Sequence, residues 1–199
     1  DNFYPYVIVE IGVNHDGSLE RGLELISEAA HAGADAIKFQ WFTAESLVSP
    51  GAVTAEYQNK KGIKDQYDLL NRLELSSSEM SVLLAKVHEL GLHGIVTVFS
   101  DQLVDDAASL DWDAWKTASP DLVHRPLIDR LMHDGRPLII STGGSTLQEI
   151  ERADDWLGSH SAAFLQCVSA YPTENGQASL AGIGAITSVT DRICGYSDH

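Results

Sequence analysis

Basic residues are scarce in this sequence, in which 13 lysines and arginines face 29 aspartates and glutamates. The formal net charge of −16 opposes binding to nucleic-acid phosphates and to anionic membranes, and no run of Lys or Arg supplies a basic patch. Long hydrophobic runs are also missing: no window of about 18 apolar residues occurs, and the first residues lack a signal-peptide pattern. We therefore expect a cytoplasmic protein that binds neither nucleic acid nor membranes.

Cysteine is the second scarce residue type, since the chain has only Cys167 and Cys194. Both lie in strand-like runs. Side chains alternate along a strand, and counting from Ser169 and Ser197 places the two thiols on opposite faces of their strands. We therefore predict no disulfide between them and two buried free thiols.

The chain repeats one unit, a strand-like apolar run followed by an amphipathic helix pattern. Seven strands are predicted, ending near residues 12, 41, 99, 118, 142, 169 and 198. Strands that alternate with helices form parallel sheets, and no glycine-rich dinucleotide fingerprint follows the first strand. The predicted fold class is α/β: residues 1–199 form a single (β/α)8 TIM barrel domain truncated after strand 7, with an open doubly wound sheet as the alternative.

Helix boundaries are predicted from capping patterns. Two pairs fit capping boxes, Ser76 with Glu79 and Ser145 with Gln148. Glycines stand where C-terminal caps belong, at positions 33, 91 and 158. The connection 42–64 has little periodicity, which is typical of a functional or mobile loop.

Polar residues gather at the predicted strand ends, where the active sites of parallel barrels form. A single such residue has an ordinary structural explanation, because Ser and Thr cap helices and Lys reaches toward water. Seven polar strand ends together indicate an active site. The residues are Glu10, Asn14, Lys38, Gln40, Thr97, Ser100, Lys116, Ser119, Asp121, Ser141, Thr142, Ser169, Tyr171, Ser197, Asp198 and His199.

Two lysines define the predicted anion site. The chain has only six lysines, and Lys38 and Lys116 lie within strands, each two residues from another polar group on the same face. A buried lysine needs an anionic partner. Hydroxyl groups close to the lysines would suit the oxygens of a phosphate or carboxylate, and four residues can supply them: Thr97, Ser119, Ser169 and Ser197.

Six motifs occur in order along the chain: "EIGVNHDG", "AIKFQ", "WKTAS", "IISTGG", "LQCVSAYPT" and "GYSDH". This ordered set, which runs from about Val7 to His199, resembles the sialic acid synthase family. Members condense phosphoenolpyruvate with an amino-sugar aldehyde such as N-acetylmannosamine to a nonulosonic acid, with release of phosphate. The serine before Ala170 is more similar to the spore-coat, pseudaminic and legionaminic branches than to the branch with asparagine there.

The resemblance implies roles for particular residues. Glu10 matches the acid/base carboxylate, and Lys38 and Lys116 are implied catalytic as well as substrate-binding groups. Three residues match sugar-side positions: Gln40, Asp121 and Tyr171. His199 matches one of two histidines that bind a divalent metal ion, Mn²⁺ or Mg²⁺, and Asp198 would orient His199 or the water. The implied phosphoenolpyruvate ligands are Lys38, Thr97, Lys116, Ser119, Ser169 and Ser197.

The sequence also departs from the family pattern. It lacks the eighth βα unit with the second metal histidine, and it lacks the C-terminal domain whose arginine reaches a neighbouring subunit in most members. The resemblance implies a homo-oligomer, a dimer, that acts on small molecules. Asp121 replaces the glutamate of many relatives, so the identity of the sugar substrate is not determined.

Two alternatives remain: a non-catalytic barrel remnant that binds an anion or a partner, and a related synthase that makes a shorter ketose acid. Four single residues also have a purely structural explanation. Glu10 could pair with a lysine, and Tyr171 could pack a turn. His15 could start a helix, and His199 could belong to a disordered terminus.

Overall fold

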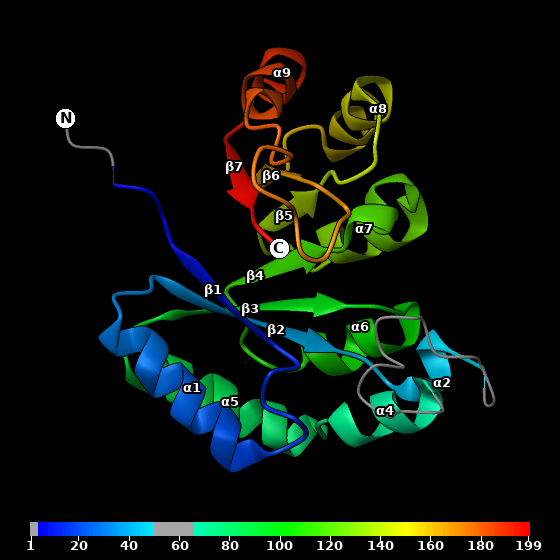
Figure 1. The fold of residues 1–199 in the computed structure, drawn as a ribbon. Coiled ribbons are helices and arrows are strands. Elements are labelled where there is room, and N and C mark those ends of the chain that lie inside the picture. Colours follow the sequence, from blue (N-terminus) through cyan, green and yellow to red (C-terminus); the bar gives the residue numbers. More distant parts are fainter. Residues whose placement is uncertain (1–3, 50–65) are drawn as a thin grey trace. The chain divides into compact units, whose positions relative to one another are not determined.

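Figure 1 shows a computed structural model of the chain, in which residues 4–49 and 66–199 are described. The chain divides into two compact units, Asp1–Trp112 and Asp113–His199, each with its own layer of parallel strands and covering helices. The prediction of a single domain over residues 1–199 stays a prediction.

In the first unit, β2 (Ala36–Trp41) pairs in parallel with β1 (Ile8–Gly12) on one side and with β3 (His93–Val98) on the other. Figure 1 shows α1 and α5 side by side against this sheet. The helices are α1 (Leu19–His31), α2 (Ala44–Leu47), α4 (Gln66–Leu73), α5 (Ser77–Glu89) and α6 (Asp101–Ala108).

In the second unit, four strands pair in sequence order and in parallel: β4 (Ala114–Thr117), β5 (Leu138–Ser141), β6 (Ala162–Cys167) and β7 (Cys194–Ser197). A 3₁₀-helix, η1 (Ser119–Val123), follows β4, and α7 (Arg125–His133), α8 (Leu147–Leu157) and α9 (Ala181–Thr190) connect the strands. All seven predicted strands are therefore present.

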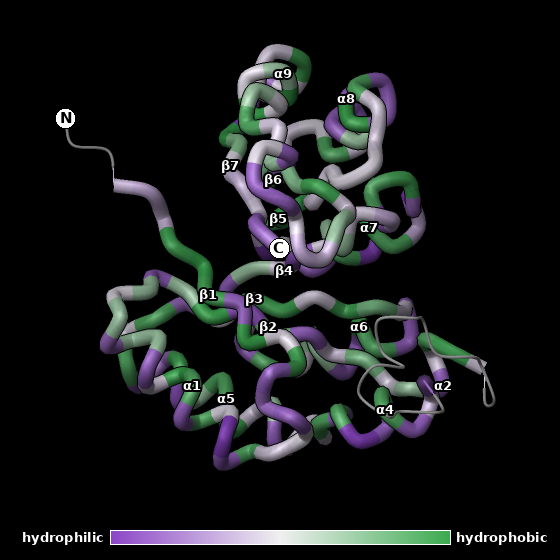
Figure 2. Tube along the Cα trace, in the orientation of Figure 1, coloured by the Kyte–Doolittle hydropathy of each residue, from purple (hydrophilic) through white to green (hydrophobic). Residues whose placement is uncertain are grey.

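Each unit has an apolar core between its sheet and its helices. In the first unit, Ile37 and Phe39 of β2 and Leu83 of α5 are fully buried, and in the second, Ile140 and Phe164 are. Apolar and polar stretches alternate along α1 in Figure 2, because one face of the helix meets the sheet and the other meets water. Of the helices that the structure describes, none has the length and hydrophobicity to span a bilayer.

The capping predictions were right for α5 and wrong by one residue for α8. The Glu79 carboxylate accepts the Ser76 backbone N–H at 2.8 Å, which confirms the first capping box. In α8 the box consists of Thr146 and Glu149 instead, with 2.8 Å between the Thr146 nitrogen and the Glu149 carboxylate. A carboxylate is a stronger acceptor than the Gln148 amide, so the helix begins one residue later than predicted.

The predicted long connection is partly helical. The described residues 42–49 contain α2, and the remainder of the predicted loop up to residue 64 lies outside the described residues. The sequence reading also missed α4, which has no fully buried residue and therefore only a weak core-facing signal. The glycines predicted to cap the C-terminal ends of helices, Gly33, Gly91 and Gly158, all have positive φ, as such caps require.

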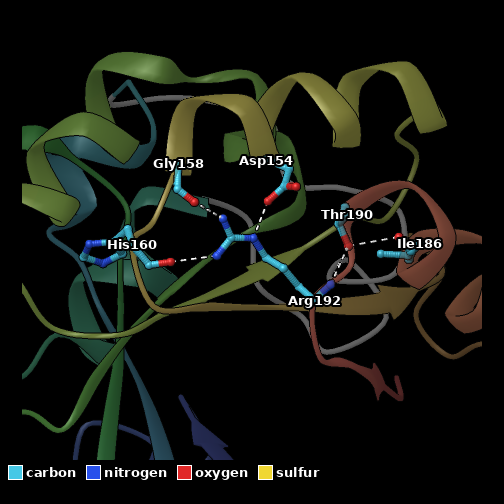
Figure 3. A network of polar contacts seen from close by, with 6 residues as sticks. All are labelled: Asp154, Gly158, His160, Ile186, Thr190 and Arg192. Atoms are coloured by element: carbon cyan, nitrogen blue, oxygen red, sulfur yellow. Dashed lines mark hydrogen bonds and ion pairs between the residues drawn. The ribbon is translucent and has the colours of Figure 1, made fainter.

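Arg192 connects the end of α8 to the segment that enters β7 (Figure 3). Its guanidinium forms an ion pair with Asp154 and donates to the carbonyl oxygens of Gly158 and His160 at 2.7 Å each. One planar side chain thus satisfies two carbonyl oxygens beyond the helix and one carboxylate, which fixes the start of β7.

Candidate active site

Lys38 lies at the centre of the polar cluster in the first unit. It stands in the middle strand, so it faces neighbours from both adjacent strands: Glu10 of β1 is its partner in register, and Thr97 comes from β3. The ammonium forms an ion pair with Glu10 and donates to the Thr97 hydroxyl at 3.5 Å. Lys38 is only 6% exposed, so the prediction that this lysine is buried is confirmed, and its anionic partner within the chain is Glu10.

Glu10 is the exposed member of this pair, since 43% of its side chain is accessible to solvent. The structural reading of Glu10 as a lysine-paired carboxylate is correct, and a half-exposed carboxylate next to a fixed cation also remains available to a substrate. Gln40, two residues beyond Lys38 on the same face of β2, is half-buried.

Gly12 lies against both of these side chains. A β-bulge interrupts the pairing between Glu10 and Gly12, and Gly12 has a φ of +52°. A Cβ atom at position 12 would be 2.7 Å from Oε1 of Glu10 and 3.4 Å from Nε2 of Gln40. The glycine therefore leaves space for the two polar side chains at this strand end.

His15 is the buried polar residue of the following loop, with 1% exposure. Its Nδ1 accepts the Gly17 backbone N–H at 3.0 Å. Burial lowers the pKa of His15 below its usual value, and this effect exceeds the opposing ones of the Gly12 backbone, Asp16 and Glu79. His15 is therefore a neutral, buried loop residue.

In the second unit, Lys116 of β4 donates to the Ser141 hydroxyl of β5 at 2.7 Å. Lys116 is 9% and Ser141 3% exposed, so this lysine is also buried, as predicted. Ser141 was recognised as a polar strand end but was not among the predicted ligands. Only the pairing of β4 with β5 shows that it lies next to Lys116.

A second group of polar atoms surrounds Gly143, just beyond β5. The Gly143 N–H donates to the Ser119 hydroxyl at 3.0 Å, and Ser119 contacts the Cys167 thiol at 3.3 Å. A Cβ atom on Gly143 would be 2.7 Å from the Ser169 hydroxyl and 2.8 Å from that of Ser119. The structure thus brings the predicted ligands Ser119 and Ser169 together, and it adds Gly143 and Cys167.

Cys167 and Cys194 are both free, as predicted, but only Cys167 is buried and Cys194 is half-buried. Sequence reasoning treated Cys167 as an ordinary buried cysteine. Its place on the same face as Ser169 was the available signal for its position among the hydroxyls.

His199 ends the third polar group of this unit, together with Ser197 and Tyr171. The imidazole stacks on the Tyr171 ring at 4.2 Å between centroids, and its Nε2 lies 3.4 Å from the Ser197 hydroxyl. Its Nδ1 is 3.1 Å from the Val168 carbonyl oxygen. These contacts place His199 against Tyr171, Ser197 and the Val168 backbone.

The geometry of His199 fits one metal ligand. A histidine whose Nδ1–H donates to a backbone carbonyl has its lone pair on Nε2, and here the Tyr171 and Ser197 hydroxyls lie 3.3 and 3.4 Å from that nitrogen, where a metal ion would replace their hydrogen bonds. Within the part of the chain that the structure describes, no group of three or more His, Cys, Asp or Glu residues could hold a metal. Asp198 accepts a hydrogen bond from Tyr196, and the Val168 carbonyl orients the His199 ring, so only the role of Asp198 toward the water stays a prediction.

Asp121, which the sequence places on the sugar side, has a structural role at the start of η1. Its carboxylate accepts the Ala118 backbone N–H at 3.2 Å. Tyr171, in contrast, is 76% exposed. Its ring covers one face of His199, so the predicted sugar-side tyrosine is next to the predicted metal ligand.

The chain matches the model of the NeuB family over residues 25–199. It is 36% identical over 197 residues to the uncharacterized protein MJ1065 of Methanocaldococcus jannaschii, covering 98% of this chain and 55% of that protein. It is 34% identical over 203 residues to an N,N'-diacetyllegionaminic acid synthase of Legionella pneumophila, covering 98% of this chain and 57% of that protein.

Among solved structures, the N-acetylneuraminic acid synthetase from Leptospira borgpetersenii, in complex with citrate, superimposes with a TM-score of 0.86 at 29% identity. The alignment covers 100% of this chain and 66% of that chain. The fold is thus the predicted α/β class of the (β/α)8 barrel, and the described residues hold seven of its parallel strands.

The chain belongs to the NeuB family, as the motif resemblance indicated. It spans about half the length of the curated relatives it matches. The comparisons assign no ligands, so the predicted substrate and metal residues stay predictions.

Proposed function

We propose that the natural protein containing this chain is a phosphoenolpyruvate-dependent synthase. It would condense phosphoenolpyruvate with the aldehyde of an N-acetylated amino sugar, or of a diamino relative, to a nonulosonic acid. The observation that carries the proposal is the polar cluster at the strand ends of the second unit, where buried Lys116 bonds to Ser141 and two further hydroxyls lie against Gly143. The names of the relatives, which are sialic and legionaminic acid synthases, support the same chemistry.

The polar groups of this cluster suit the oxygens of a small polyanion. A buried ammonium is stable only with a hydrogen-bonded or charged partner, and hydroxyl groups can turn their O–H toward an incoming oxyanion. The phosphate and carboxylate of phosphoenolpyruvate are such groups. The residues proposed to bind them are those expected from the sequence: Lys38, Thr97, Lys116, Ser119, Ser169 and Ser197.

In the proposed reaction, C3 of phosphoenolpyruvate attacks the aldehyde carbon and forms the new C–C bond. Water then adds at C2, and the bond between C2 and the bridging oxygen breaks, so that phosphate leaves with that oxygen. Glu10 would transfer protons to and from the reacting groups, because its carboxylate is half-exposed and is held by the buried Lys38 ammonium. Gln40, Asp121 and Tyr171 remain the proposed sugar-side residues.

His199 would hold a divalent metal ion, Mn²⁺ or Mg²⁺, through Nε2, the nitrogen opposite its bond to Val168. When bound, such an ion polarises the aldehyde carbonyl. We further propose that the protein is cytoplasmic and acts as a homodimer on small molecules.

The direct test incubates the purified full-length natural protein with phosphoenolpyruvate, a divalent metal and a set of acceptor sugars. The set contains N-acetylmannosamine, a diacetamido hexose and a short aldose phosphate. We expect a nonulosonic acid by mass spectrometry, with ¹⁸O from the bridging position of phosphoenolpyruvate recovered in phosphate. Turnover of the short aldose phosphate alone would favour a synthase for shorter ketose acids, and no product with any acceptor would favour a non-catalytic protein.

The anion site is tested separately by thermal unfolding. Phosphoenolpyruvate should raise the melting temperature of the natural protein, and Lys38→Ala and Lys116→Ala should each abolish that rise, because a bound anion loses its buried counter-charge. Lys86→Ala is the matched control. Lys86 lies on α5 in an ion pair with Glu89 at the surface, so its removal should leave the rise intact. An unchanged rise in both strand variants would contradict the proposed anion site.

A further inference from the structure

The loop between β1 and α1 holds a buried polar residue that the proposed mechanism does not use. His15 is almost fully buried, although a histidine in a surface turn would ordinarily be solvated. Its Cβ lies against α1, where a Cβ atom on Gly22 would be 3.7 Å away. Packing and hydrogen bonds together therefore fix the position of the imidazole.

The imidazole ties the two ends of this loop together. It accepts the N–H of Gly17 through Nδ1 and is hydrogen-bonded to the backbone of Gly12. Three consecutive backbone turns lie between these points, closed by the N–H groups of Asn14, Asp16 and Ser18. Residues 12–17 therefore form a short closed loop with His15 at its centre.

Gly12 links this loop to the Glu10 carboxylate. The bulge at the end of β1 and the positive φ of Gly12 turn the backbone so that Oε1 of Glu10 lies above the Gly12 α-carbon, within 2.7 Å of where a Cβ would be. The other carboxylate oxygen forms the ion pair with Lys38. One carboxylate oxygen thus pairs with the Lys38 ammonium, and the other occupies the space that a side chain at position 12 would fill.

We propose that His15 is a positioning residue for Glu10. It acts by fixing the backbone of Gly12, which lies next to the Glu10 carboxylate. The predicted effect of His15 on turnover rests on the proposed synthase function, whereas its predicted effect on the position of Glu10 does not. A displacement of Gly12 by about 1 Å would move the carboxylate by a similar distance, and misplacement of that size lowers catalytic rates by up to about a hundredfold.

Two variants separate the hydrogen bonds of His15 from its packing. His15→Leu fills the buried space but removes both bonds, whereas His15→Asn keeps a polar atom near the place of Nδ1. In the full-length natural protein we expect kcat to fall about tenfold or more in His15→Leu and to recover partly in His15→Asn. A purely packing role predicts the reverse order, with leucine better tolerated than asparagine, and that result would overturn the proposal.

A double-mutant cycle with Glu10→Gln tests whether His15 acts through Glu10. Once the carboxylate is lost its position no longer matters, so His15→Leu should lower kcat by less than about twofold in the Glu10→Gln background. Additive losses would overturn the proposal. If His15→Leu fails to fold, Gly12→Ala takes its place in the cycle, because its Cβ displaces Glu10 directly.

A crystal structure of His15→Leu gives a readout that does not depend on activity. The Glu10 carboxylate should be displaced from Lys38, and a carboxylate in its original place would overturn the proposal even in a protein without synthase activity. An inactive wild-type protein, by contrast, would refute the proposed function alone.

Discussion

Gly143 determines the spacing of three polar side chains at the carboxyl end of β5. Ser119, Cys167 and Ser169 all lie within 3.2 Å of the position that a Cβ atom on this glycine would take. The backbone N–H of Gly143 also orients the Ser119 hydroxyl. In the sequence this residue is one half of a Gly-Gly pair, which predicts a turn but does not reveal its proximity to the hydroxyls.

Gly143→Ala should weaken phosphoenolpyruvate binding by about tenfold or more, because the new methyl group displaces the Ser119 and Ser169 hydroxyls. Isothermal titration calorimetry measures the loss. Gly184→Ala is the control, since Gly184 lies in α9 with nothing within 4 Å of its added Cβ. It should leave binding unchanged and stabilise the helix by about 0.5–1 kcal/mol. Equal affinities in both variants would show that the Gly143 cluster does not bind the anion.

At the scale of elements, the sequence predicts the number and order of the strands, whereas the predicted ends of five strands are one or two residues late. The strand β2 ends at the predicted residue, because Ile37, Phe39 and Trp41 have strong strand propensity and five of its six residues are buried. The start of α8 was predicted one residue early, since neighbouring Ser-Thr and Gln-Glu pairs offer two capping boxes of similar pattern. Which box forms depends on acceptor strength and on the direction from which the chain enters the helix.

The Arg192 network joins the end of α8 to the start of β7, and its bond from Arg192 to Gly158 spans 34 residues of sequence. Arg192→Met should lower the free energy of unfolding by about 3–5 kcal/mol, because it leaves the Asp154 carboxylate, of which 20% is exposed, without its cation. Urea unfolding followed by circular dichroism measures the change. Arg125→Met is the control, since the Arg125–Asp129 pair is exposed on α7, and it should cost at most about 1 kcal/mol. Similar losses in both variants would mean that the network adds no more than a surface pair.

At the scale of the whole molecule, the net charge of −16 opposes compaction by like-charge repulsion. The acidic residues are also arranged unevenly, and α1 carries Glu20, Glu24 and Glu28 at successive i, i+4 positions, where like charges repel.

Raising NaCl from about 0.02 M to about 0.5 M should therefore increase the melting temperature of the protein, because salt screens this repulsion. Differential scanning fluorimetry follows the shift. Glu24→Lys with Glu151→Lys reverses two exposed charges and should reduce the dependence on salt. A melting temperature that falls with NaCl, or an unchanged slope in the double variant, would contradict a role for overall charge.

The sequence alone determined the order and type of the strands, the α/β class, the two buried lysines and the family, because these depend on local periodicity and on motifs contiguous in the chain. It also placed Ser119 and Ser169 correctly as neighbours at strand ends. The tertiary structure decided which atoms meet: Glu10 with Lys38, Lys116 with Ser141, and Ser119 with Gly143. These contacts join residues 24–28 positions apart, and strand pairing and backbone turns bring such residues together. Side-chain chemistry read along the chain therefore identifies the polar groups, and only the folded backbone fixes the partner of each.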